Sequence, residues 1–298
     1  MPIDSQHIRA SLPLAPLQLL DLPWLAQGGI ECAVLRLDLI DPLISGNKWF
    51  KLLFHLERAE RQGAAGLISL GGAYSNHLHA LAAAGHKFGF ETVGLLRGEP
   101  KPTATVSDLQ RFGMRLHWLG YGGYRERNRE GFWQVWHEQY PTLLPVPEGG
   151  GGLLGAQGCA AIVKQAEAQL AGLGWSDFDA WWLAAGTGTT MAGIALAERG
   201  RRLVYGAMAV PPGHGVAEQV GAIVQQGFEV VPASRKGFGK TDAALSAFMA
   251  DQAQALPLEP LYTGKALMAL HEQVAQGALR RGTRLVFVHT GGMQGARA

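Results

Sequence analysis

The segment AAGTGTTMAG at residues 184–193 carries the clearest chemical signal in the chain, because it joins an apolar run to a helical pattern through glycines and hydroxyl side chains. The N-terminus of a helix offers unpaired backbone N–H groups and a partial positive charge, so this turn predicts a phosphate-binding site. The alternative is a turn that only packs a strand tightly against a helix. A dinucleotide-binding pattern is excluded, because Met191 stands where that pattern needs Gly or Ala. The candidate phosphate-binding residues are Gly186, Thr187, Gly188, Thr189 and Thr190.

Two more turns carry side chains that could act on a ligand. Lys48 lies in SGNKWFK at residues 45–51, ahead of a helical pattern. Ser75 and Asn76 lie in GGAYSNHLH at residues 71–79, where a strand ends and a helix would start. Each has an ordinary structural explanation, since a single lysine is mostly a surface charge and Ser or Asn is a good helix N-cap. The same hydroxyl and amide would also project into a cleft between two lobes, so these residues gain weight only in combination.

Two other motifs fail on spacing. GFGKT at residues 237–241 resembles the end of a nucleoside-triphosphate loop, but that pattern requires glycine at position 234, where the chain has Ser234. His77, His79 and His86 suggest a metal site, yet His77 and His79 are two residues apart on a helix and point to different faces. Zinc needs three or four converging ligands. We therefore expect neither a nucleoside triphosphate nor a metal.

Short apolar runs alternate with longer helical patterns, which is typical of βαβ units and a parallel sheet. This pattern predicts a doubly wound α/β architecture. The segment PVPEGGGGLLG at residues 145–155 interrupts it, and its prolines and glycines argue against a regular element there. The expected strands cover residues 66–70, 92–96, 114–119, 180–184, 203–208, 229–231 and 285–289, and the expected helices cover residues 76–88, 105–112, 124–139, 156–170, 190–198, 216–226 and 265–276.

The composition of the chain limits the kinds of molecule that it is expected to bind. The chain has 298 residues, of which 41 are glycine and 17% are charged, and its formal net charge is +2. Without a long basic run it has no electrostatic footprint for nucleic acid or an anionic membrane. The uncharged stretch at residues 180–197 carries GTGTT in its middle, which argues against a membrane span. Cys32 and Cys159 cannot form a disulfide framework, and no signal peptide is visible, so we expect small-molecule ligands and a cytoplasmic location.

Five motifs together resemble one family in order and approximate spacing. They are SGNKWFK, GGAYSNH, AAGTGTT, LYTGKA at residues 261–266 and HTGG at residues 289–292. The family is that of the pyridoxal-phosphate-dependent 1-aminocyclopropane-1-carboxylate deaminase and D-cysteine desulfhydrase. The resemblance implies a two-lobed tryptophan-synthase-β-like fold with parallel twisted sheets flanked by helices, and it suggests a homodimer. Residues 1–50 and 155–298 would form the large cofactor-binding lobe, and residues 51–154 the smaller inserted lobe.

The resemblance also implies roles for single residues. Lys48 matches the lysine that forms the Schiff base with pyridoxal phosphate and later carries a proton, which suits an amine enclosed beside a cationic cofactor. Ser75 matches the serine that meets the substrate carboxylate or acts as a nucleophile, and Asn76 matches the residue bonded to the ring hydroxyl of the cofactor. Residues 187–190 match the phosphate loop, which itself needs no lysine. Tyr262 matches a tyrosine near the substrate that moves a proton or lowers the pKa of the lysine.

Thr263 would face the pyridine nitrogen, a position where the deaminase carries a glutamate. A hydroxyl cannot hold a protonated ring by charge, so Thr263 favours a neutral ring and β-elimination, as in the desulfhydrase branch. Two positions depart from the family pattern. Phe238 stands where a tyrosine is usual, and His79 stands where an arginine is usual, so the substrate residues match less well than the cofactor residues.

The leading hypothesis is a pyridoxal-phosphate-dependent lyase acting on a small amino acid such as D-cysteine. It would remove the β-substituent and give an α-keto acid, ammonia and the leaving group. One alternative is ring-opening deamination of 1-aminocyclopropane-1-carboxylate, against which Thr263 and Phe238 argue. The other is a protein that binds pyridoxal phosphate but has a different or lost substrate activity.

Overall fold

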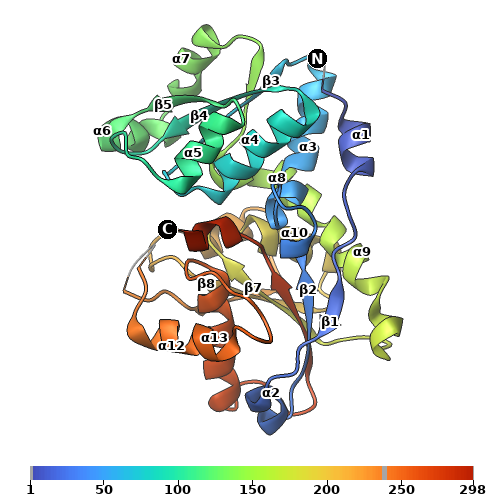
Figure 1. The fold of residues 1–298 in the computed structure, drawn as a ribbon. Coiled ribbons are helices and arrows are strands. Elements are labelled where there is room, and N and C mark those ends of the chain that lie inside the picture. Colours follow the sequence, from blue (N-terminus) through green and yellow to red (C-terminus); the bar gives the residue numbers. More distant parts are fainter. Residues whose placement is uncertain (1–2, 237–239, 298) are drawn as a thin grey trace.

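The computed structural model describes residues 3–236 and 240–297, which form two β-sheets with flanking helices (Figure 1). The larger sheet, in the lower half of Figure 1, has the strand order β1-β2-β10-β7-β8-β9. Strand β1 pairs antiparallel with β2, and all other neighbours in this sheet are parallel. Its strands are β1 (Leu17–Leu19), β2 (Glu31–Arg36), β7 (Ala180–Ala185), β8 (Leu203–Met208), β9 (Phe228–Pro232) and β10 (Arg284–His289).

The smaller sheet, in the upper half of Figure 1, is parallel throughout and has the order β5-β4-β3-β6. Its strands are β3 (Gly66–Gly71), β4 (Glu91–Leu96), β5 (Arg115–Trp118) and β6 (Leu143–Pro145). The chain therefore begins the larger sheet, builds the smaller one and then returns to complete the larger one. Two parallel sheets flanked by helices confirm the α/β fold class predicted from the sequence.

Helices cover both sheets. In chain order they are α1 (Ser5–Ala10), α2 (Pro23–Gly28), α3 (Asn47–Arg61), α4 (Asn76–Phe88), α5 (Ala104–Arg111), α6 (Gly120–Arg125), α7 (Phe132–Gln139), α8 (Gly152–Cys159), α9 (Ala161–Glu167), α10 (Thr189–Glu198), α11 (Val216–Gly221), α12 (Ala243–Gln252) and α13 (Thr263–Ala275). Three short 3-10 helices matter below: η3 (Glu148–Gly150), η4 (Leu170–Leu173) and η5 (Met293–Arg297). Within the described residues, none of the helices combines the length and the apolar character that a bilayer span needs.

The central strands β3 and β7 are buried along their whole length, as parallel sheets covered on both faces require. Strand β7 carries two adjacent tryptophans whose side chains tie it to the helices on its two sides. Trp181 Nε1 donates to Glu198 Oε1 of α10 (2.7 Å), and Trp182 Nε1 donates to the carbonyl oxygen of Ala266 in α13 (2.9 Å). Both indoles are thus buried with their polar atom satisfied, which holds β7 between α10 and α13.

Glycines allow three helices to come into backbone contact at the junction of the two halves (Figure 1). A Cβ on Gly158 of α8 would lie 2.0 Å from the carbonyl oxygen of Phe50 in α3. A Cβ on Gly193 of α10 would lie 2.2 Å from the carbonyl oxygen of Ala156 in α8. Helix α8 therefore holds α3, which carries Lys48, beside α10, which follows the predicted phosphate loop.

Two predicted features differ from the structure because the sequence did not show what conformation the glycines in them adopt. The break expected at residues 145–155 is shorter, since β6 ends at Pro145 and α8 already begins at Gly152. Positive φ angles at Gly149, Gly150 and Gly152 complete the turn within a few residues. The single helix expected at residues 124–139 is divided into α6 and α7, because Gly131 adopts a φ of 82° just before α7 starts.

Other elements were missed or misjudged in length. Strands β1 and β6 have three residues each, which is too short for an alternating pattern to be recognised. Strand β2 and helices α1, α2 and α12 were not predicted either. Helix α11 ends at Gly221, earlier than the expected residue 226, and the helix expected at residues 156–170 is divided at Ala160 between α8 and α9.

Gly158→Ala should destabilise the protein, because the added methyl group would force α8 away from α3. Overpacking of this kind costs about 1–3 kcal/mol, and the free energy of unfolding measured by chemical denaturation should fall by that amount. Gly172→Ala in η4 is the matched control, because a Cβ there meets no atom within 4 Å. Equal losses of stability in the two variants would contradict the close packing of α8 on α3.

Candidate active site

A cavity of about 790 Å³ lies between the two halves. Its walls are the segments that follow β3, β4, β5, β6, β7 and β10, the start of α3, and residues 260–262 ahead of α13. Ligands of open parallel sheets bind at the carboxyl ends of the strands, and the volume suits a small molecule. Lys48, Ser75, Asn76, Tyr262 and the loop at residues 186–190 all line this cavity, so the structure brings together residues that are far apart in the chain.

Lys48 is the second residue of α3 and is partly exposed to the cavity. Its Nζ donates to Asn47 Oδ1 (2.9 Å), and Asn47 Nδ2 donates to Thr190 Oγ1 (2.8 Å). One amide group therefore joins the lysine amine to the turn between β7 and α10. Desolvation and the charge of neighbouring Lys51 lower the pKa of Lys48 well below its usual value, which favours the neutral, nucleophilic amine.

The residue before this helix must be glycine. Gly46 has a φ of 73°, and a Cβ on it would lie 2.0 Å from the carbonyl oxygen of Thr290. Both the left-handed conformation and the close approach exclude a side chain. Gly46 thereby presses the start of α3, and Lys48 with it, against the segment that follows β10.

The turn from β7 to α10 forms the wall that the sequence predicts to bind phosphate. Gly188 is the N-cap of α10 with a φ of 72°. The hydroxyl oxygens of Thr187 and Thr189 lie 3.0 Å apart, and the hydroxyl of Thr190 accepts the hydrogen bond from Asn47. Hydroxyl groups gathered at the positive end of a ten-residue helix provide the donors that an anion requires.

Lys51 was missed by the sequence analysis, which expected the phosphate loop to work without a lysine. The side chain of Lys51 is buried, and its Nζ lies 3.3 Å from the carbonyl oxygen of Gly149 and 3.5 Å from Thr187 Oγ1. Burial lowers its pKa. The signal was available, because a residue three positions after Lys48 on a helix lies on the same face. The loop itself has no lysine, but α3 brings one to it.

Ser75 and Asn76 combine the structural and the ligand-facing explanations. Ser75 is the N-cap of α4, and its Oγ accepts a hydrogen bond from the backbone N–H of Leu78 (3.2 Å). The same hydroxyl lines the cavity and keeps its own O–H for a ligand. Asn76 is the first residue of α4 and also lines the cavity, and its Oδ1 accepts from Gln294 Nε2 (3.0 Å).

Thr263 does not line the cavity, and this corrects the expectation that it faces the pyridine nitrogen. Its side chain is fully buried and its hydroxyl donates to Glu259 Oε1 (3.1 Å). The Glu259 carboxylate also accepts from the backbone N–H groups of Leu261 and Tyr262 and from that of Thr263. Glu259 thus draws Thr263 into the turn that begins α13. The threonine that does line the cavity is Thr290, in the HTGG motif after β10.

Tyr262 enters the cavity beside the phosphate loop. Its ring packs over Gly186, where a Cβ would lie 2.9 Å from Cε1 of the tyrosine. Desolvation and the nearby carboxylates of Glu259 and Glu148 raise the pKa of Tyr262. The phenol therefore keeps its proton at neutral pH and acts as a hydrogen-bond donor.

The histidines differ in their relation to the cavity. His77 lines it, and His77 Nε2 lies 2.8 Å from Ser69 Oγ, while burial keeps the pKa of His77 well below its usual value. His79 does not line the cavity, although the sequence marked it as a substrate position. Its Nε2 lies 3.2 Å from Asp108 Oδ2 in the packing of α4 on α5. In the described part of the chain, no three His, Cys, Asp or Glu side chains are placed to hold a metal ion.

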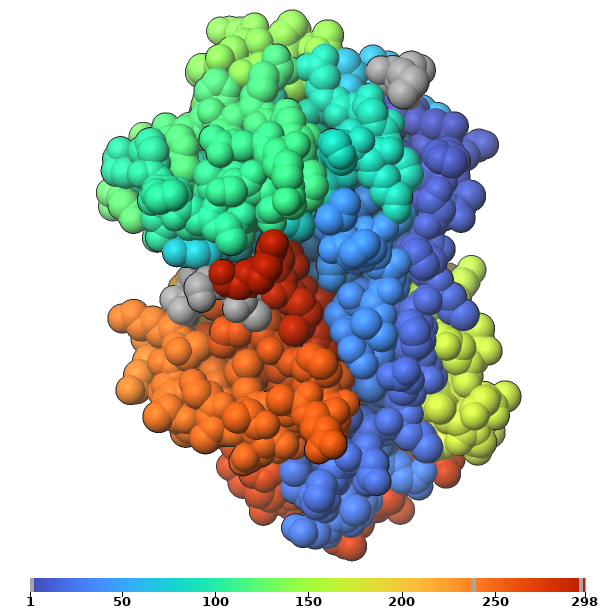
Figure 2. Space-filling model, in the orientation of Figure 1, coloured from blue at the N-terminus to red at the C-terminus, as the bar shows by residue number. Residues whose placement is uncertain are grey.

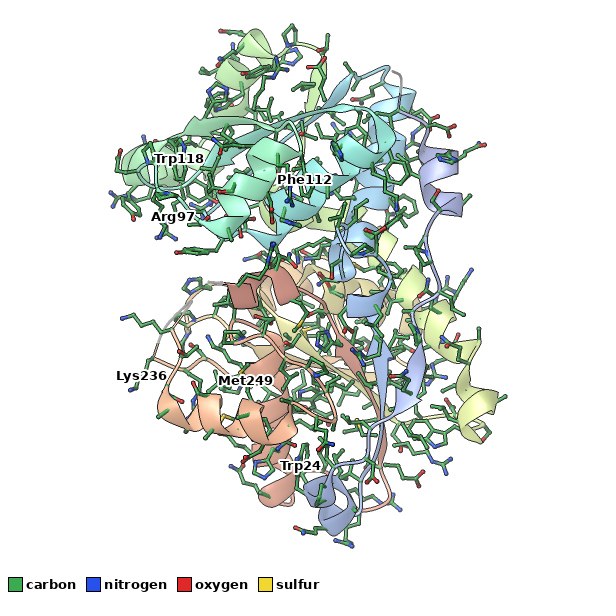
Figure 3. All side chains as sticks on the ribbon, viewed as in Figure 1. Trp24, Arg97, Phe112, Trp118, Lys236 and Met249 are labelled. Carbon is green, nitrogen blue, oxygen red and sulfur yellow. The ribbon has the colours of Figure 1, made fainter. Side chains whose placement is uncertain are left out.

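The outer rim of the cavity comes mainly from the upper half. The Arg97 guanidinium lies 5.7 Å from the centre of the Tyr121 ring, and Lys101 Nζ lies 4.5 Å from the centre of the Tyr74 ring. Figure 3 shows Arg97 on the side of the upper half that faces the lower one. Residues 237–239, including Phe238, lie outside the described residues, so the substrate role of Phe238 stays a prediction.

The family profile described as "Pyridoxal-phosphate dependent enzyme" matches residues 10–291. The chain belongs to this family. D-cysteine desulfhydrase of Serratia proteamaculans is 28% identical over 295 residues, which cover 89% of this chain and 87% of that protein. A mitochondrial bifunctional D-cysteine desulfhydrase/1-aminocyclopropane-1-carboxylate deaminase of Arabidopsis thaliana is 27% identical over 316 residues, which cover 96% of this chain and 78% of that protein.

A solved structure supports the same fold. The crystal structure of an ACC deaminase homologue matches 100% of this pyridoxal-phosphate-dependent enzyme and 97% of its own chain, with a TM-score of 0.80 and 24% identity. This similarity confirms the tryptophan-synthase-β-like fold expected from the sequence. The family also confirms pyridoxal phosphate as the cofactor.

The cavity residues fit pyridoxal phosphate chemically. Lys48 offers an amine of lowered pKa for the aldehyde of the cofactor. The start of α10, with the hydroxyls of Thr187 and Thr189 and the ammonium group of Lys51, forms a cationic, donor-rich cradle for a phosphate. Asn76 and Thr290 supply polar groups for the substituents and nitrogen of a ring. The lining therefore holds the kinds of donor that a ring carrying a phosphate requires.

Lys51→Met should weaken binding of pyridoxal phosphate roughly 10- to 150-fold, because a charge-assisted hydrogen bond contributes about 1.5–3 kcal/mol. Titration of the apoprotein, followed by the visible absorbance of the bound cofactor, measures the loss. Pyridoxal lacks the phosphate and provides the control, for which the variant should lose little affinity. A similar loss for both ligands would show that Lys51 does not act on the phosphate.

Proposed function

We propose that this protein is a pyridoxal-phosphate-dependent lyase that eliminates the β-substituent of a small amino acid, in the manner of a D-cysteine desulfhydrase. The observation that carries the proposal is the Lys48 amine, whose pKa is lowered and which Asn47 holds beside Thr190 of the phosphate loop. An amine in this state attacks an aldehyde readily. Relatives named D-cysteine desulfhydrase support the substrate class.

Lys48 has two tasks in this proposal. Bound pyridoxal phosphate supplies an electron sink that makes the Cα–H bond of an amino acid acidic. As a free amine beside the bound substrate, Lys48 would accept the proton from Cα. The lowered pKa suits this step, because the lysine must be neutral before it can take up a proton.

In this proposal Ser75 binds the carboxylate of the substrate, and Tyr262 assists the departure of the group on Cβ. The carboxylate would lie at the start of α4, a thirteen-residue helix, where the Ser75 hydroxyl and the backbone N–H groups are donors. The group that leaves from Cβ departs with the bonding electron pair. Tyr262, protonated because its pKa is raised, donates a hydrogen bond to that developing negative charge.

The surroundings of the cofactor ring favour elimination over ring opening. The carboxylate of Glu259 is hydrogen-bonded to the turn ahead of α13. The described carboxylates that line the cavity, Glu99 and Glu148, follow strands of the smaller sheet. We therefore place no carboxylate opposite the ring nitrogen. We assign to Thr290 the place expected for Thr263 opposite the ring nitrogen. A nitrogen facing a hydroxyl remains neutral, which is sufficient for β-elimination.

The lobe boundaries are part of the same proposal. We infer a smaller lobe at residues 51–154 and a larger lobe at residues 1–50 and 155–298, because every strand of the smaller sheet lies between Gly66 and Pro145. Helix α3 crosses the boundary between the two. We also propose that the protein is a homodimer and is located in the cytoplasm, as the family resemblance and the two unpaired cysteines suggest.

Lys48→Ala should abolish the visible absorbance band of the bound cofactor, because the neighbouring amine of Lys51 is engaged by Gly149 and Thr187 beside the phosphate loop. Borohydride reduction followed by peptide mass analysis should attach the cofactor to Lys48 in the unsubstituted protein and to no residue of the variant. Lys164→Ala is the control, since Lys164 is exposed on α9 and absent from the cavity lining. Survival of the band in Lys48→Ala would refute the assignment.

D-cysteine should release sulfide and pyruvate from the holoenzyme faster than L-cysteine does. The measurement is a parallel assay of both cysteine isomers and of 1-aminocyclopropane-1-carboxylate, with sulfide, keto acid and ammonia determined separately. Comparable turnover of 1-aminocyclopropane-1-carboxylate would favour the deaminase instead. A protein that shows the cofactor band but converts none of a wider panel of D- and L-amino acids would favour a binding protein with lost activity.

A further inference from the structure

The short helix η5 joins the two halves beside the cavity. It follows β10 of the larger sheet, and two of its described side chains, Gln294 and Arg297, hydrogen-bond to helices of the upper half. Gln294 Nε2 donates to Asn76 Oδ1 at the start of α4 (3.0 Å), and Arg297 Nη2 donates to Asp108 Oδ2 in α5 (2.6 Å). Figures 1 and 2 show this dark red segment reaching from the lower half to the upper half.

Asp108 anchors one end of η5. Its buried carboxylate also accepts a hydrogen bond from Arg111 Nη2 (2.7 Å), and its Oδ2 lies 3.2 Å from His79 Nε2. A carboxylate with three such partners holds a fixed position. Arg297 therefore ties η5 to the upper half at a point away from the cavity, and His79 contributes to this anchor.

The hydrogen bond at the other end of η5 determines which atom of the Asn76 amide faces a ligand. Oδ1 is engaged by Gln294 Nε2, so the Nδ2 group is the donor that Asn76, a residue of the cavity lining, can offer a ligand. Gly292 leaves the room for this orientation, because a Cβ there would lie 2.6 Å from Asn76 Nδ2. An amide has donors on one atom and acceptors on the other, so turning it over would present an oxygen instead.

We propose that Gln294 is a positioning residue that keeps the Nδ2 group of Asn76 directed at the ring hydroxyl of pyridoxal phosphate. The inference rests on the proposed function and on the bond from Asn76 to that hydroxyl, which the family resemblance implies. A donor stabilises negative charge on the ring oxygen, whereas an acceptor in the same place destabilises it. Gln294 thereby influences the charge distribution of the cofactor without touching it.

Two substitutions distinguish positioning from simple packing. Gln294→Glu keeps the size of the side chain but offers only acceptors, so it attracts Asn76 Nδ2 and turns Oδ1 toward the ring hydroxyl. Gln294→Met keeps the approximate size and removes the hydrogen bond. We expect the affinity for pyridoxal phosphate to fall about 2- to 12-fold in Gln294→Met, as expected for one neutral hydrogen bond, and further in Gln294→Glu. Only the latter should shift the visible band.

The ranking of the two variants is the first decisive result. A contact that only holds the two halves together would tolerate glutamate better than methionine, because glutamate is the closer mimic of glutamine. A smaller loss of affinity in Gln294→Glu than in Gln294→Met, with an unchanged band in both, would overturn the inference. Thermal unfolding of each apoprotein shows whether it is folded. Should Gln294→Glu fail to fold, the double variant below decides the question.

The double variant Gln294→Met/Asn76→Leu tests whether Gln294 acts through Asn76. If it does, the double variant binds pyridoxal phosphate no more weakly than Asn76→Leu alone. Additive losses would overturn the inference and leave the role of Asn76 intact. Full affinity and an unchanged band in Asn76→Leu would instead refute the proposed role of Asn76, and the inference with it, while the assignment of Lys48 would stand.

Gln165→Glu is the matched control. Gln165 of α9 also joins separate segments, since its Nε2 donates to the carbonyl oxygen of Pro13 and its Oε1 accepts from the backbone N–H of Ala15. It does not line the cavity. We expect this variant to keep both the cofactor affinity and the visible band, and a loss equal to that of Gln294→Glu would overturn the inference.

Discussion

Backbone contact among α3, α8 and α10 is the constraint on which the active site depends. Lys48 is the second residue of one of these helices and the phosphate loop precedes another, and the Asn47 amide links the two through hydrogen bonds of 2.9 and 2.8 Å. Such bonds weaken when the helices separate by a few tenths of an ångström. Gly158 and Gly193 permit the required distance. Glycines of this chain therefore permit close helix packing as well as the turns that line the cavity.

Lys48 and Lys51, two of the lysines that line the cavity, make opposite demands on charge that a bound cofactor would satisfy. Desolvation lowers the pKa of both Lys48 and Lys51, and the charge of Lys51 lowers that of Lys48 further. A phosphate dianion beside Lys51 would favour its charged form, whereas Lys48 would have to be a neutral amine to link to the aldehyde of the cofactor. Binding of the cofactor would thus require the charged form of Lys51 and the neutral form of Lys48.

Sequence reasoning succeeded where local geometry decides the outcome. The turn at residues 186–190, Ser75 as an N-cap and the central strands follow from short-range patterns, and parallel sheets bring the ends of such strands together. It failed where the direction of a side chain decides. Thr263 was expected at the ring, but the carboxylate of Glu259 takes its hydroxyl, and Thr290 lines the cavity in its place. The i,i+3 spacing from Lys48 indicates the helix face of Lys51 but not its contact with Thr187, and the contact of Gln294 with Asn76 joins residues far apart in the chain, which no local pattern contains.

The position of β10 has a consequence for the synthesis of the chain. β10 lies between β2 and β7, so the larger sheet remains in two unpaired pieces until residues 284–289 have left the ribosome. Residues 66–145, which contain every strand of the smaller sheet, can pair long before that moment. Until then β2 and β7 each expose an edge that can pair with other chains. Newly made protein is therefore most prone to aggregate just before its last strand arrives, and the cofactor can be held only afterwards.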